Sequence, residues 1–560
     1  MSGRTVLAGP QPIAAIARAM DLPEEMLEPH GPHVAKIRLE ALDQLGDRPR
    51  ARYVVVTAIT PTPLGEGKTT TTIGLGQGLR HIGRRAVIAI RQASMGPTFG
   101  IKGGAGGGGR SQVVPFEILN LHLTGDGHAV TAAHNLLAAM VDNHLHHGNT
   151  LDLDPRSITW PRVLDVNDRA LRHIVVGLGE RSDGVPRQTA FAITAASEVM
   201  ATLGLTTSLH DLRQRLGRIV VGSTRSGQPV TADDLRAAGA MTVLLREAIK
   251  PNLLQTLEHT PALVHAGPFG NIATGTSSIL ADQIGVRCGE FLVTEAGFGA
   301  DMGAERFFNI KCRVSGLVPD AAVVVATVRA LKAHSGAHRV VAGRDLPDGL
   351  LRENPDEVAV GASNLRKQLE NVRLHGVRPV VAINAFPTDF PSEHRVIAEV
   401  AEGLGAPAIV TTHFRDGGAG AAALAEAVDE VSRTPDPFRF LYPDATPLRE
   451  KVAAVATRVY GADGVDFSPE AARRIDALQR QGLGSLPVCI AKTHLSLSAD
   501  PTLVGAPTGW RLPVREVRAS VGAGFVYVLC GEISTMPGLG SHPAAERIDI
   551  DQYGEVVGLT

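Results

Sequence analysis

Short apolar runs alternate with longer amphipathic stretches along most of the chain. The pattern predicts strands at residues 53–59, 86–91, 262–266, 321–327, 339–342, 379–384, 407–412 and 525–531. It predicts helices at residues 69–82, 131–146, 194–203, 362–374, 393–404, 420–433, 447–460 and 469–481. Alternation of this kind is typical of α/β proteins, in which buried parallel strands read as nearly continuous hydrophobic runs. We therefore predict an α/β fold built on a mostly parallel sheet.

Changes in composition along the chain divide it into three predicted parts. Residues 1–345 are expected to form a P-loop-type domain, because a glycine-rich phosphate-binding pattern follows their first buried strand. Residues 346–520 are expected to form a second α/β domain, beginning near the proline and glycine of Asp345–Asn354. Residues 521–560 lack long helical periodicity and are expected to form a small C-terminal unit.

The stretch from Thr57 to Thr72 carries a phosphate-binding pattern. A strand, a glycine loop and a helix start follow one another, so loop N–H groups and the helix dipole face one anion. Lys68 adds a full positive charge, and the Thr69 hydroxyl stands where it could ligate magnesium. The candidate nucleotide-binding residues are Thr62, Pro63, Leu64, Gly65, Glu66, Gly67, Lys68 and Thr69. A strict P-loop has glycine where this chain has Thr62; the alternative is a glycine-rich turn with a surface lysine.

A second basic residue follows the next strand. The run from Arg84 to Ile90 reads as a buried strand and ends at Arg91. Ligands of open parallel sheets bind at the carboxyl ends of the strands, so Lys68 and Arg91 are expected on one rim. The planar guanidinium suits a phosphate or carboxylate, and the alternative is a surface salt bridge.

The stretch from Gly96 to Arg110 is dominated by glycine, which makes up eight of its fifteen residues. It fits either a flexible linker or a loop whose backbone approaches a ligand. Regular patterns bracket it on both sides, which favours the loop.

Two aromatic residues follow predicted strands of the second part. Phe386 comes just after the run that ends in Asn384, and Phe414 follows the run that ends in Thr412. Flat aromatic faces stack on flat ligand rings, although either residue could instead pack in the core. We expect this aromatic rim to lie apart from the phosphate rim.

Long strings in the chain resemble formate–tetrahydrofolate ligase, also called formyltetrahydrofolate synthetase. They include Pro63-Leu-Gly-Glu-Gly-Lys-Thr-Thr70, Gly96-Pro-Thr-Phe-Gly-Ile-Lys-Gly-Gly-Ala105, Asn120-Leu-His-Leu-Thr-Gly-Asp126, Thr294-Glu-Ala-Gly-Phe-Gly-Ala-Asp301, Ala385-Phe-Pro-Thr-Asp389 and Thr535-Met-Pro-Gly-Leu539. The strings occur in order and cover nearly the whole chain, which is far more specific than a lone P-loop.

The resemblance implies ATP-dependent ligation of formate to tetrahydrofolate through formyl phosphate. It implies ATP and magnesium, with tetrahydrofolate as co-substrate, and adds a monovalent cation and a homotetramer as further expectations. Lys68 and Arg91 would act in catalysis, with Thr69 on magnesium. Asp126 would ligate magnesium through water or handle the amine proton. Phe386 and Phe414 would sandwich the folate ring, with Phe298 nearby.

Several positions depart from the family pattern. The family usually has tryptophan at Phe414, often tyrosine at Arg110, and usually proline at Ala93. Thr274–Ser278 and His494-Leu495 also differ. These departures concern cofactor affinity and recognition of the folate chain more than the reaction class.

Bulk properties fit a cytoplasmic enzyme of small molecules. The 560 residues include 55 basic and 57 acidic side chains, so a net charge of −2 gives no general attraction for nucleic acid. No membrane-spanning run or signal-peptide core is visible, and the four cysteines show no zinc-binding spacing. The cluster His144–His147 reads as a solvated helix end, with a metal site as the alternative.

Three other functions remain open at this point. One is another ATP-dependent ligase that activates a carboxylate, and the second is a P-loop switch ATPase that drives partner binding. The third is a catalytically weakened folate-binding homologue, which the departures suggest. Dependence of ADP release on formate and tetrahydrofolate separates them.

Overall fold

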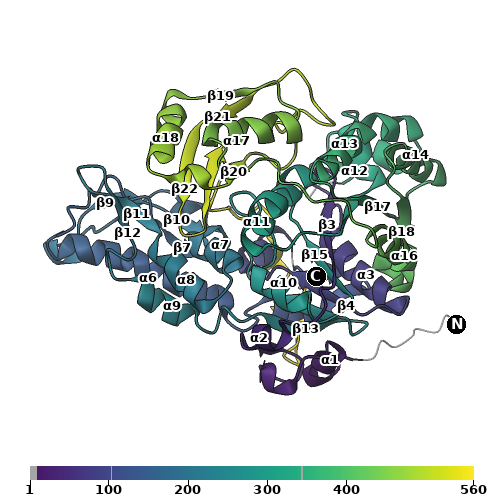
Figure 1. Ribbon diagram of the computed structural model, residues 1–560, viewed down its shortest axis with the longest axis horizontal. Coiled ribbons are helices and arrows are strands. Elements are labelled where there is room, and N and C mark those ends of the chain that lie inside the picture. Colours follow the sequence, from purple (N-terminus) through teal and green to yellow (C-terminus); the bar gives the residue numbers. More distant parts are fainter. Residues whose placement is uncertain (1–8, 103, 342–344, 532, 560) are drawn as a thin grey trace.

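A large mixed sheet organises the molecule (Figure 1). The computed structural model describes residues 9–102, 104–341, 345–531 and 533–559. From β14 to β18 every pairing is parallel, whereas β13 and β2 pair antiparallel at one side. The strand order is β1 (Leu27–Pro29), β2 (Ala35–Ile37), β13 (Asn252–Thr256), β14 (Pro261–Val264), β4 (Ala86–Ile90), β15 (Phe291–Glu295), β3 (Arg52–Ala58), β16 (Ala321–Ala326), β17 (Pro379–Asn384) and β18 (Ala408–Thr411).

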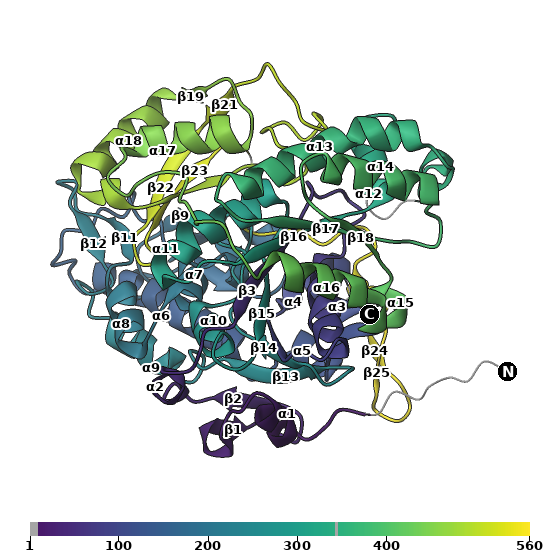
Figure 2. The same cartoon turned by 45° about the vertical axis from the view of Figure 1, so that its right-hand side comes forward.

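Helices cover both faces of the parallel part. On one face Val54 and Val56 of β3 pack with α3 (Lys68–His81) and α16 (Ala422–Val431). Tyr53 and Val55 point to the other face, toward α10 (Ile279–Gly285), α13 (Pro355–Arg373) and α14 (Pro391–Glu402). Figure 2 shows α13 and α14 above β17 and β18, with α3 and α16 below them. Burial on both faces explains why β3 reads as an unbroken apolar run.

Two lobes with their own cores flank this sheet. A helical lobe, at the left of Figure 1, packs α6 (Asp126–His146), α7 (Glu198–Leu205), α8 (Leu209–Gly217) and α9 (Ala238–Leu245). The C-terminal lobe, at the top, packs α17 (Leu448–Ala454) and α18 (Pro469–Arg480) on a three-stranded sheet. That sheet has the order β20 (Val488–Ala491), β23 (Phe525–Leu529), β22 (Glu516–Ser520).

Most predicted elements are present, with shifted ends. The helix predicted at 131–146 begins at Asp126, and the one predicted at 194–203 is a short 3₁₀ turn followed by α7, which Ser197 caps. The strand predicted at 339–342 is wrong for residues 339–341, and residue 342 lies outside the described part. Val341 is 39% exposed. Adjacent valines favour extended backbone, but they form a strand only where a neighbouring strand pairs with them.

The predicted segment boundaries fall inside continuous sheets. β16 pairs with β17 across position 345, so the strands of the first two predicted parts share one sheet. β23 pairs with both β20 and β22 across position 521. The α/β class and the mostly parallel sheet are confirmed. The division of the chain into three parts stays a prediction.

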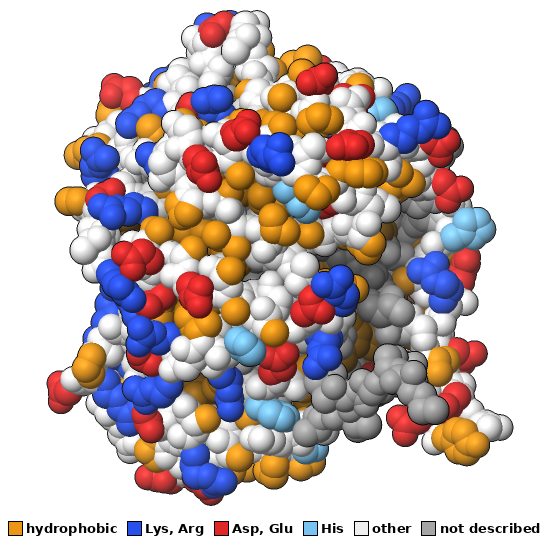
Figure 3. Space-filling view, turned by 90° about the vertical axis from the view of Figure 1, so that its right-hand side faces the viewer, with side chains coloured by type: hydrophobic (Ala, Val, Ile, Leu, Met, Phe, Trp, Pro, Cys, Tyr) orange, Lys and Arg blue, Asp and Glu red, His pale blue; other side chains and the backbone are white. Residues whose placement is uncertain are grey.

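Charged side chains of both signs are interspersed over the face shown in Figure 3. Among the described residues, no helix is both long enough and apolar enough to cross a membrane. All four cysteines are buried and unpaired as free thiols.

Candidate functional site

The loop between β3 and α3 is held by hydrogen bonds between its own residues. Gly65 and Gly67 have φ angles of 73° and 79°, which favour glycine. The buried Glu66 carboxylate accepts hydrogen bonds from the Thr62 N–H (2.7 Å) and hydroxyl (3.2 Å). Its other oxygen lies 3.4 Å from the Lys68 Nζ, whose side chain is 16% exposed. The loop thus presents the N-terminus of α3 and one held ammonium to a ligand, an arrangement suited to a phosphate.

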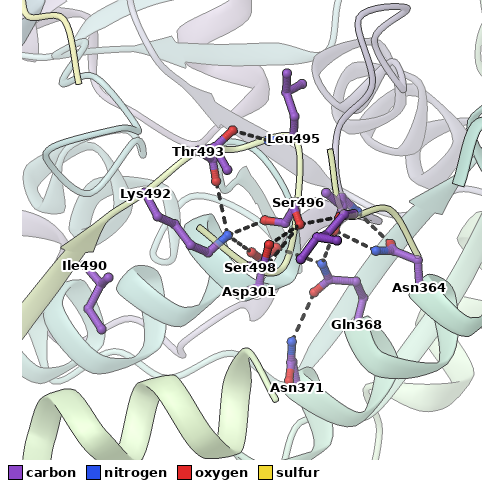
Figure 4. A network of polar contacts seen from close by, with 12 residues as sticks. Asp301, Asn364, Gln368, Asn371, Ile490, Lys492, Thr493, Leu495, Ser496 and Ser498 are labelled. Carbon is purple, nitrogen blue, oxygen red and sulfur yellow. Dashed lines mark hydrogen bonds and ion pairs between the residues drawn. The ribbon is translucent and has the colours of Figure 1, made fainter. Parts of the chain in front are cut away.

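Buried polar contacts fix the residue at which this loop starts. Thr60 donates its N–H to Asn364 Oδ1 (2.9 Å), and its hydroxyl accepts from Asn364 (2.8 Å) and Gln368 (3.0 Å). Gln368 also donates to Asp301 (2.7 Å), whose other oxygen accepts from Lys492 (2.9 Å), as Figure 4 shows. Burial lowers the pKa of Lys492, and Asp301 opposes that shift. The start of the loop is therefore tied to the segment that precedes His494.

The Glu295 carboxylate contacts both Thr69 of α3 and Arg91 after β4. It ends β15, which lies between β3 and β4, and its side chain is only 5% exposed. One oxygen accepts from the Thr69 hydroxyl (2.6 Å), and the other lies 3.5 Å from Arg91 Nε. The structure thus brings Thr69 and Arg91 to one carboxylate, and two oxygen ligands suitable for a hard cation stand side by side.

The sequence does not indicate Glu295 as a site residue. β15 is a short strand whose polar end, Thr294-Glu295, breaks the apolar run, so no strand is predicted there. The available signal is an acidic residue that follows the apolar run Phe291–Val293 after one threonine, in a chain with a P-loop-like pattern. In such proteins an acidic residue at a strand end commonly holds the metal ion.

The aromatic rim is continuous with the phosphate rim, which corrects the expectation that the two lie apart. β3, β16 and β17 are successive strands, so the loops after them are neighbours. Asn384, the last residue of β17, donates to the Glu66 carbonyl (3.1 Å), and a Cβ at Gly67 would lie 2.6 Å from its Nδ2. Because Phe386 follows Asn384 by two residues, a ligand can span both rims.

Neither Phe386 nor Phe414 packs in the core. Phe386 is half-buried, and its N–H donates to Asp389 Oδ2 (2.9 Å). Phe414 lies in the short helix α15 (His413–Asp416) and is 58% exposed. Its carbonyl accepts from the Arg110 N–H (2.8 Å). Both rings are therefore available to a ligand at the surface.

The glycine-rich stretch packs closely against protein. A Cβ at Gly109 would meet the Phe414 carbonyl at 2.1 Å, and one at Gly107 would meet the Ser111 carbonyl at 2.1 Å. A Cβ at Gly96 would meet the Ile193 side chain at 2.4 Å. Glycine is needed at these positions because protein segments approach them, whatever else the loop contacts.

Phe298 lies near the same edge, three residues after Glu295 along the chain. Its φ of 62° is unusual for a bulky residue. Its ring stacks on His494, with 4.6 Å between centroids and a 28° angle between planes. A Cβ at Gly270 would lie 2.7 Å from the ring. The strained backbone thus directs the Phe298 ring toward His494. His494 is one of the positions at which the sequence departs from the family pattern.

Asp126 does not contact the phosphate rim. It begins α6, and its buried carboxylate accepts from Lys36 (2.7 Å) and Asn252 (2.7 Å). The pair with Lys36 is almost fully buried, at 1% and 3% exposed side chain. The magnesium and proton-transfer roles expected for Asp126 stay predictions, and its contacts favour an anchor between α6 and the sheet.

His413, beside the aromatic rim, is buried as a neutral group. His413 precedes Phe414, and its Nε2 lies 3.2 Å from the Thr71 hydroxyl of α3. Burial lowers the pKa of His413 to about 4. It therefore carries no charge at neutral pH and serves to pack α15 on α3.

Known proteins similar to this chain over its length share one family name. The formate–tetrahydrofolate ligase family model matches residues 6–560. The formate–tetrahydrofolate ligase of Saccharopolyspora erythraea is 70% identical over 550 residues, covering 98% of this chain and 97% of that protein. Those of Cutibacterium acnes and Chloroflexus aurantiacus are 62% identical over 548 residues and 56% identical over 558 residues, each covering 98% of this chain and 97% and 98% of the relative. On this match the chain belongs to the formate–tetrahydrofolate ligase family.

Proposed function

We propose that the protein ligates formate to tetrahydrofolate at the expense of ATP, giving 10-formyltetrahydrofolate, ADP and phosphate. The observation that carries the proposal is that one edge of the sheet holds the phosphate cradle, Arg91 and the exposed aromatic rings. The end-to-end family match supports the same reading.

The proposed reaction has two steps that balance. A formate oxygen attacks the γ-phosphorus of ATP, and ADP leaves, giving formyl phosphate. Nitrogen 10 of tetrahydrofolate then attacks the formyl carbon, phosphate leaves, and the nitrogen loses its proton. Formate alone is a poor acylating agent because its leaving group would be hydroxide, whereas phosphate leaves readily.

In the first step Lys68 and Arg91 reduce repulsion between two anions. The N-terminus of α3 binds the β- and γ-phosphates, and Lys68 neutralises charge on the transferring group. To do so it must leave Glu66, from which it is 3.4 Å distant, for the phosphate. Arg91 uses its planar guanidinium to hold formate and then formyl phosphate.

The residues present fit a magnesium ion. Thr69 and Glu295 supply a hydroxyl and a carboxylate that already meet at 2.6 Å. Among the described residues no group of three or more His, Cys, Asp or Glu side chains is placed to hold a metal. A P-loop magnesium ion fits this sparse set, because it takes its other ligands from the nucleotide and water. When bound, it would neutralise phosphate charge in the first step.

Phe386 and Phe414 would stack on the pterin ring, with Phe298 nearby. Phe386 is half-buried and Phe414 exposed beside the phosphate rim, so a pterin stacked there would bring its acceptor amine toward formyl phosphate. Assembly as a tetramer and use of a monovalent cation remain expectations from the family.

Measuring ADP release with each substrate omitted in turn tests the proposal. We expect ADP only when ATP, formate and tetrahydrofolate are all present, with one 10-formyltetrahydrofolate formed per ADP. Release with ATP alone would indicate a switch ATPase, and release with a different carboxylate or acceptor would indicate another ligase. Tetrahydrofolate binding without turnover would indicate a weakened homologue.

A further inference from the structure

Arg329 lies at the junction of the phosphate and aromatic rims. It is in α12 (Val328–His334), directly after β16, and β16 is the strand between β3 and β17. Its side chain therefore stands between the loop that carries Lys68 and the loop that carries Phe386. The Arg329 Cζ lies 3.4 Å from the centroid of the Phe386 ring. At that distance the guanidinium covers one face of the ring.

Ion pairing does not explain this position. Within the described part of the chain, the Arg329 guanidinium forms no hydrogen bond or salt bridge, and its Nε is buried without a partner. The other arginines of the described residues that cover aromatic rings are held by acceptors as well: Arg52 by Asp429, Arg313 by Asp444 and Arg449 by Asp476. Burial lowers the pKa of Arg329, and the more distant Asp389 and Glu66 oppose that shift. Among the hydrogen bonds, ion pairs and ring contacts of the described residues, the guanidinium makes only its contact with the Phe386 ring.

The contact covers one face of Phe386, so a ligand that stacks on this ring must use the opposite face. The Phe386 backbone is fixed by Asp389, and the guanidinium occupies the face toward α12. A flat ligand on the opposite face would lie about 3.5 Å from the ring and therefore about 7 Å from the guanidinium. Arg329 cannot hydrogen-bond to such a ligand ring through the phenyl group, so it must act through Phe386.

We propose that Arg329 is a positioning residue whose guanidinium fixes the plane of Phe386 and so sets the surface on which the pterin ring of tetrahydrofolate stacks. The identity of the flat ligand rests on the proposed function. The complete arrangement is a stack of guanidinium, phenyl ring and pterin ring, in which the cation also polarises the phenyl group.

A double-mutant cycle between Arg329 and Phe386 tests this inference. The Michaelis constants for tetrahydrofolate, ATP and formate are measured for wild type, Arg329→Met, Phe386→Leu and the double variant. We expect Arg329→Met to raise the tetrahydrofolate constant about three- to thirty-fold, the range of a partly desolvated cation–π contact. The constants for ATP and formate should change less than about two-fold, and kcat should change little. In the Phe386→Leu background, Arg329→Met should add less than about two-fold.

Two further variants separate positioning from general loss of structure. Arg449→Met removes a matched arginine from the face of Phe467 in the C-terminal lobe, where the Cζ–centroid distance is 4.9 Å. It should leave all three constants unchanged. Arg329→Lys keeps the charge and loses the planar group, so its tetrahydrofolate constant should lie between those of wild type and Arg329→Met. If Arg329→Met does not fold, the same cycle is run with Arg329→Lys.

Other outcomes overturn the inference. An Arg329 effect that persists in the Phe386→Leu background would mean direct contact with substrate, and an effect confined to ATP would make Arg329 a nucleotide-binding residue. An unchanged tetrahydrofolate constant would remove Arg329 from the site. The wild-type requirement for formate and tetrahydrofolate is measured first, so failure of the proposed function is seen independently of these variants.

Discussion

The Thr69 hydroxyl donates a 2.6 Å hydrogen bond to the Glu295 carboxylate, joining the first turn of α3 to the end of β15. The same carboxylate faces Arg91 at 3.5 Å. One buried carboxylate thus contacts both the hydroxyl of Thr69 and the guanidinium of Arg91. In the proposed reaction, magnesium would give this carboxylate a cation to hold, and the phosphate of ATP would give Arg91 an anion.

Glu295→Gln should weaken the use of magnesium more than the use of ATP. The amide keeps the shape of the side chain but removes the charge that attracts the cation. We expect the magnesium concentration for half-maximal ADP release to rise at least about ten-fold, as for loss of one metal-orienting group. Glu290→Gln, at the residue directly before the same strand, is the matched control. Equal magnesium curves for wild type and Glu295→Gln would remove Glu295 from the metal site.

Lys68→Ala should lower turnover by two to three orders of magnitude (~10²–10³) while the protein stays folded. Loss of one preorganised group at a transferring phosphoryl group costs about 3–4 kcal/mol, or roughly 10²–10³ in kcat. Folding should be little affected, because the Lys68 contact with Glu66 is long, at 3.4 Å. Single-turnover ADP formation and the melting temperature are measured on the same sample. Near-normal turnover in a folded variant would reject the P-loop reading.

Arg91→Lys should impair phosphate transfer although the charge is retained. A lysine ammonium cannot reproduce the planar pair of donors that a carboxylate or phosphate engages. The readout is the reverse half-reaction, transfer of phosphate from carbamoyl phosphate to ADP. We expect at least about a ten-fold loss, the equivalent of one charge-assisted hydrogen bond. Unimpaired transfer would place Arg91 outside the site.

The sequence predicts the parts of this site that have a strong local pattern. The loop from Thr62 to Thr69 is such a part, because strand, glycines, lysine and helix start are consecutive. Phe386 and Phe414 are candidates from the sequence because each follows an apolar run. What the sequence does not give is strand order. Placing β16 and β17 next to β3 requires pairings between residues far apart in the chain, so the adjacency of the two rims was not predictable.

Residues that act by tertiary contact are missed for the same reason. Glu295 ends a strand whose apolar run is broken by Thr294, and Arg329 follows a strand without any motif. Asp126 shows the converse. It stands in a conspicuous Thr-Gly-Asp string, yet its carboxylate binds Lys36 and Asn252 away from the phosphate rim. Local sequence patterns identify loops and helix starts well, but they do not identify which residues a side chain contacts.

Glu305→Gln should change how stability depends on pH. Glu305 is buried, and burial raises its pKa to about 7. Its ordinary value is about 4.3, so between about pH 4.3 and 7 the folded state binds a proton that the unfolded state has released. Stability is therefore lost as pH rises through this window, by an amount on the order of 3 kcal/mol. The uncharged glutamine variant should lack this loss.

The measurement is urea unfolding of both proteins at pH 5 and pH 8. Wild type should lose more stability between these two values than Glu305→Gln, and the variant should be the more stable protein at pH 8. Asn309, which donates to Glu305 at 3.0 Å, can still donate to the amide oxygen of glutamine. Parallel pH profiles for the two proteins would show that Glu305 does not titrate in this range.

Phe414→Trp restores the residue that the family usually has and tests the stacking role of this position. Phe414 is 58% exposed and lies over Gly108 and Gly109, so a larger ring has room and should change unfolding free energy by less than about 0.5 kcal/mol. If the ring stacks on the pterin, tetrahydrofolate affinity should hold or rise, because stacking grows with ring area. ATP affinity should change less.

The new indole also reports binding directly, since the chain has only two other tryptophans, Trp160 and Trp510. Its fluorescence should be quenched by tetrahydrofolate and not by ATP. Unchanged stability together with unquenched fluorescence and weaker tetrahydrofolate binding would show that Phe414 lies at the rim without contacting the folate ring.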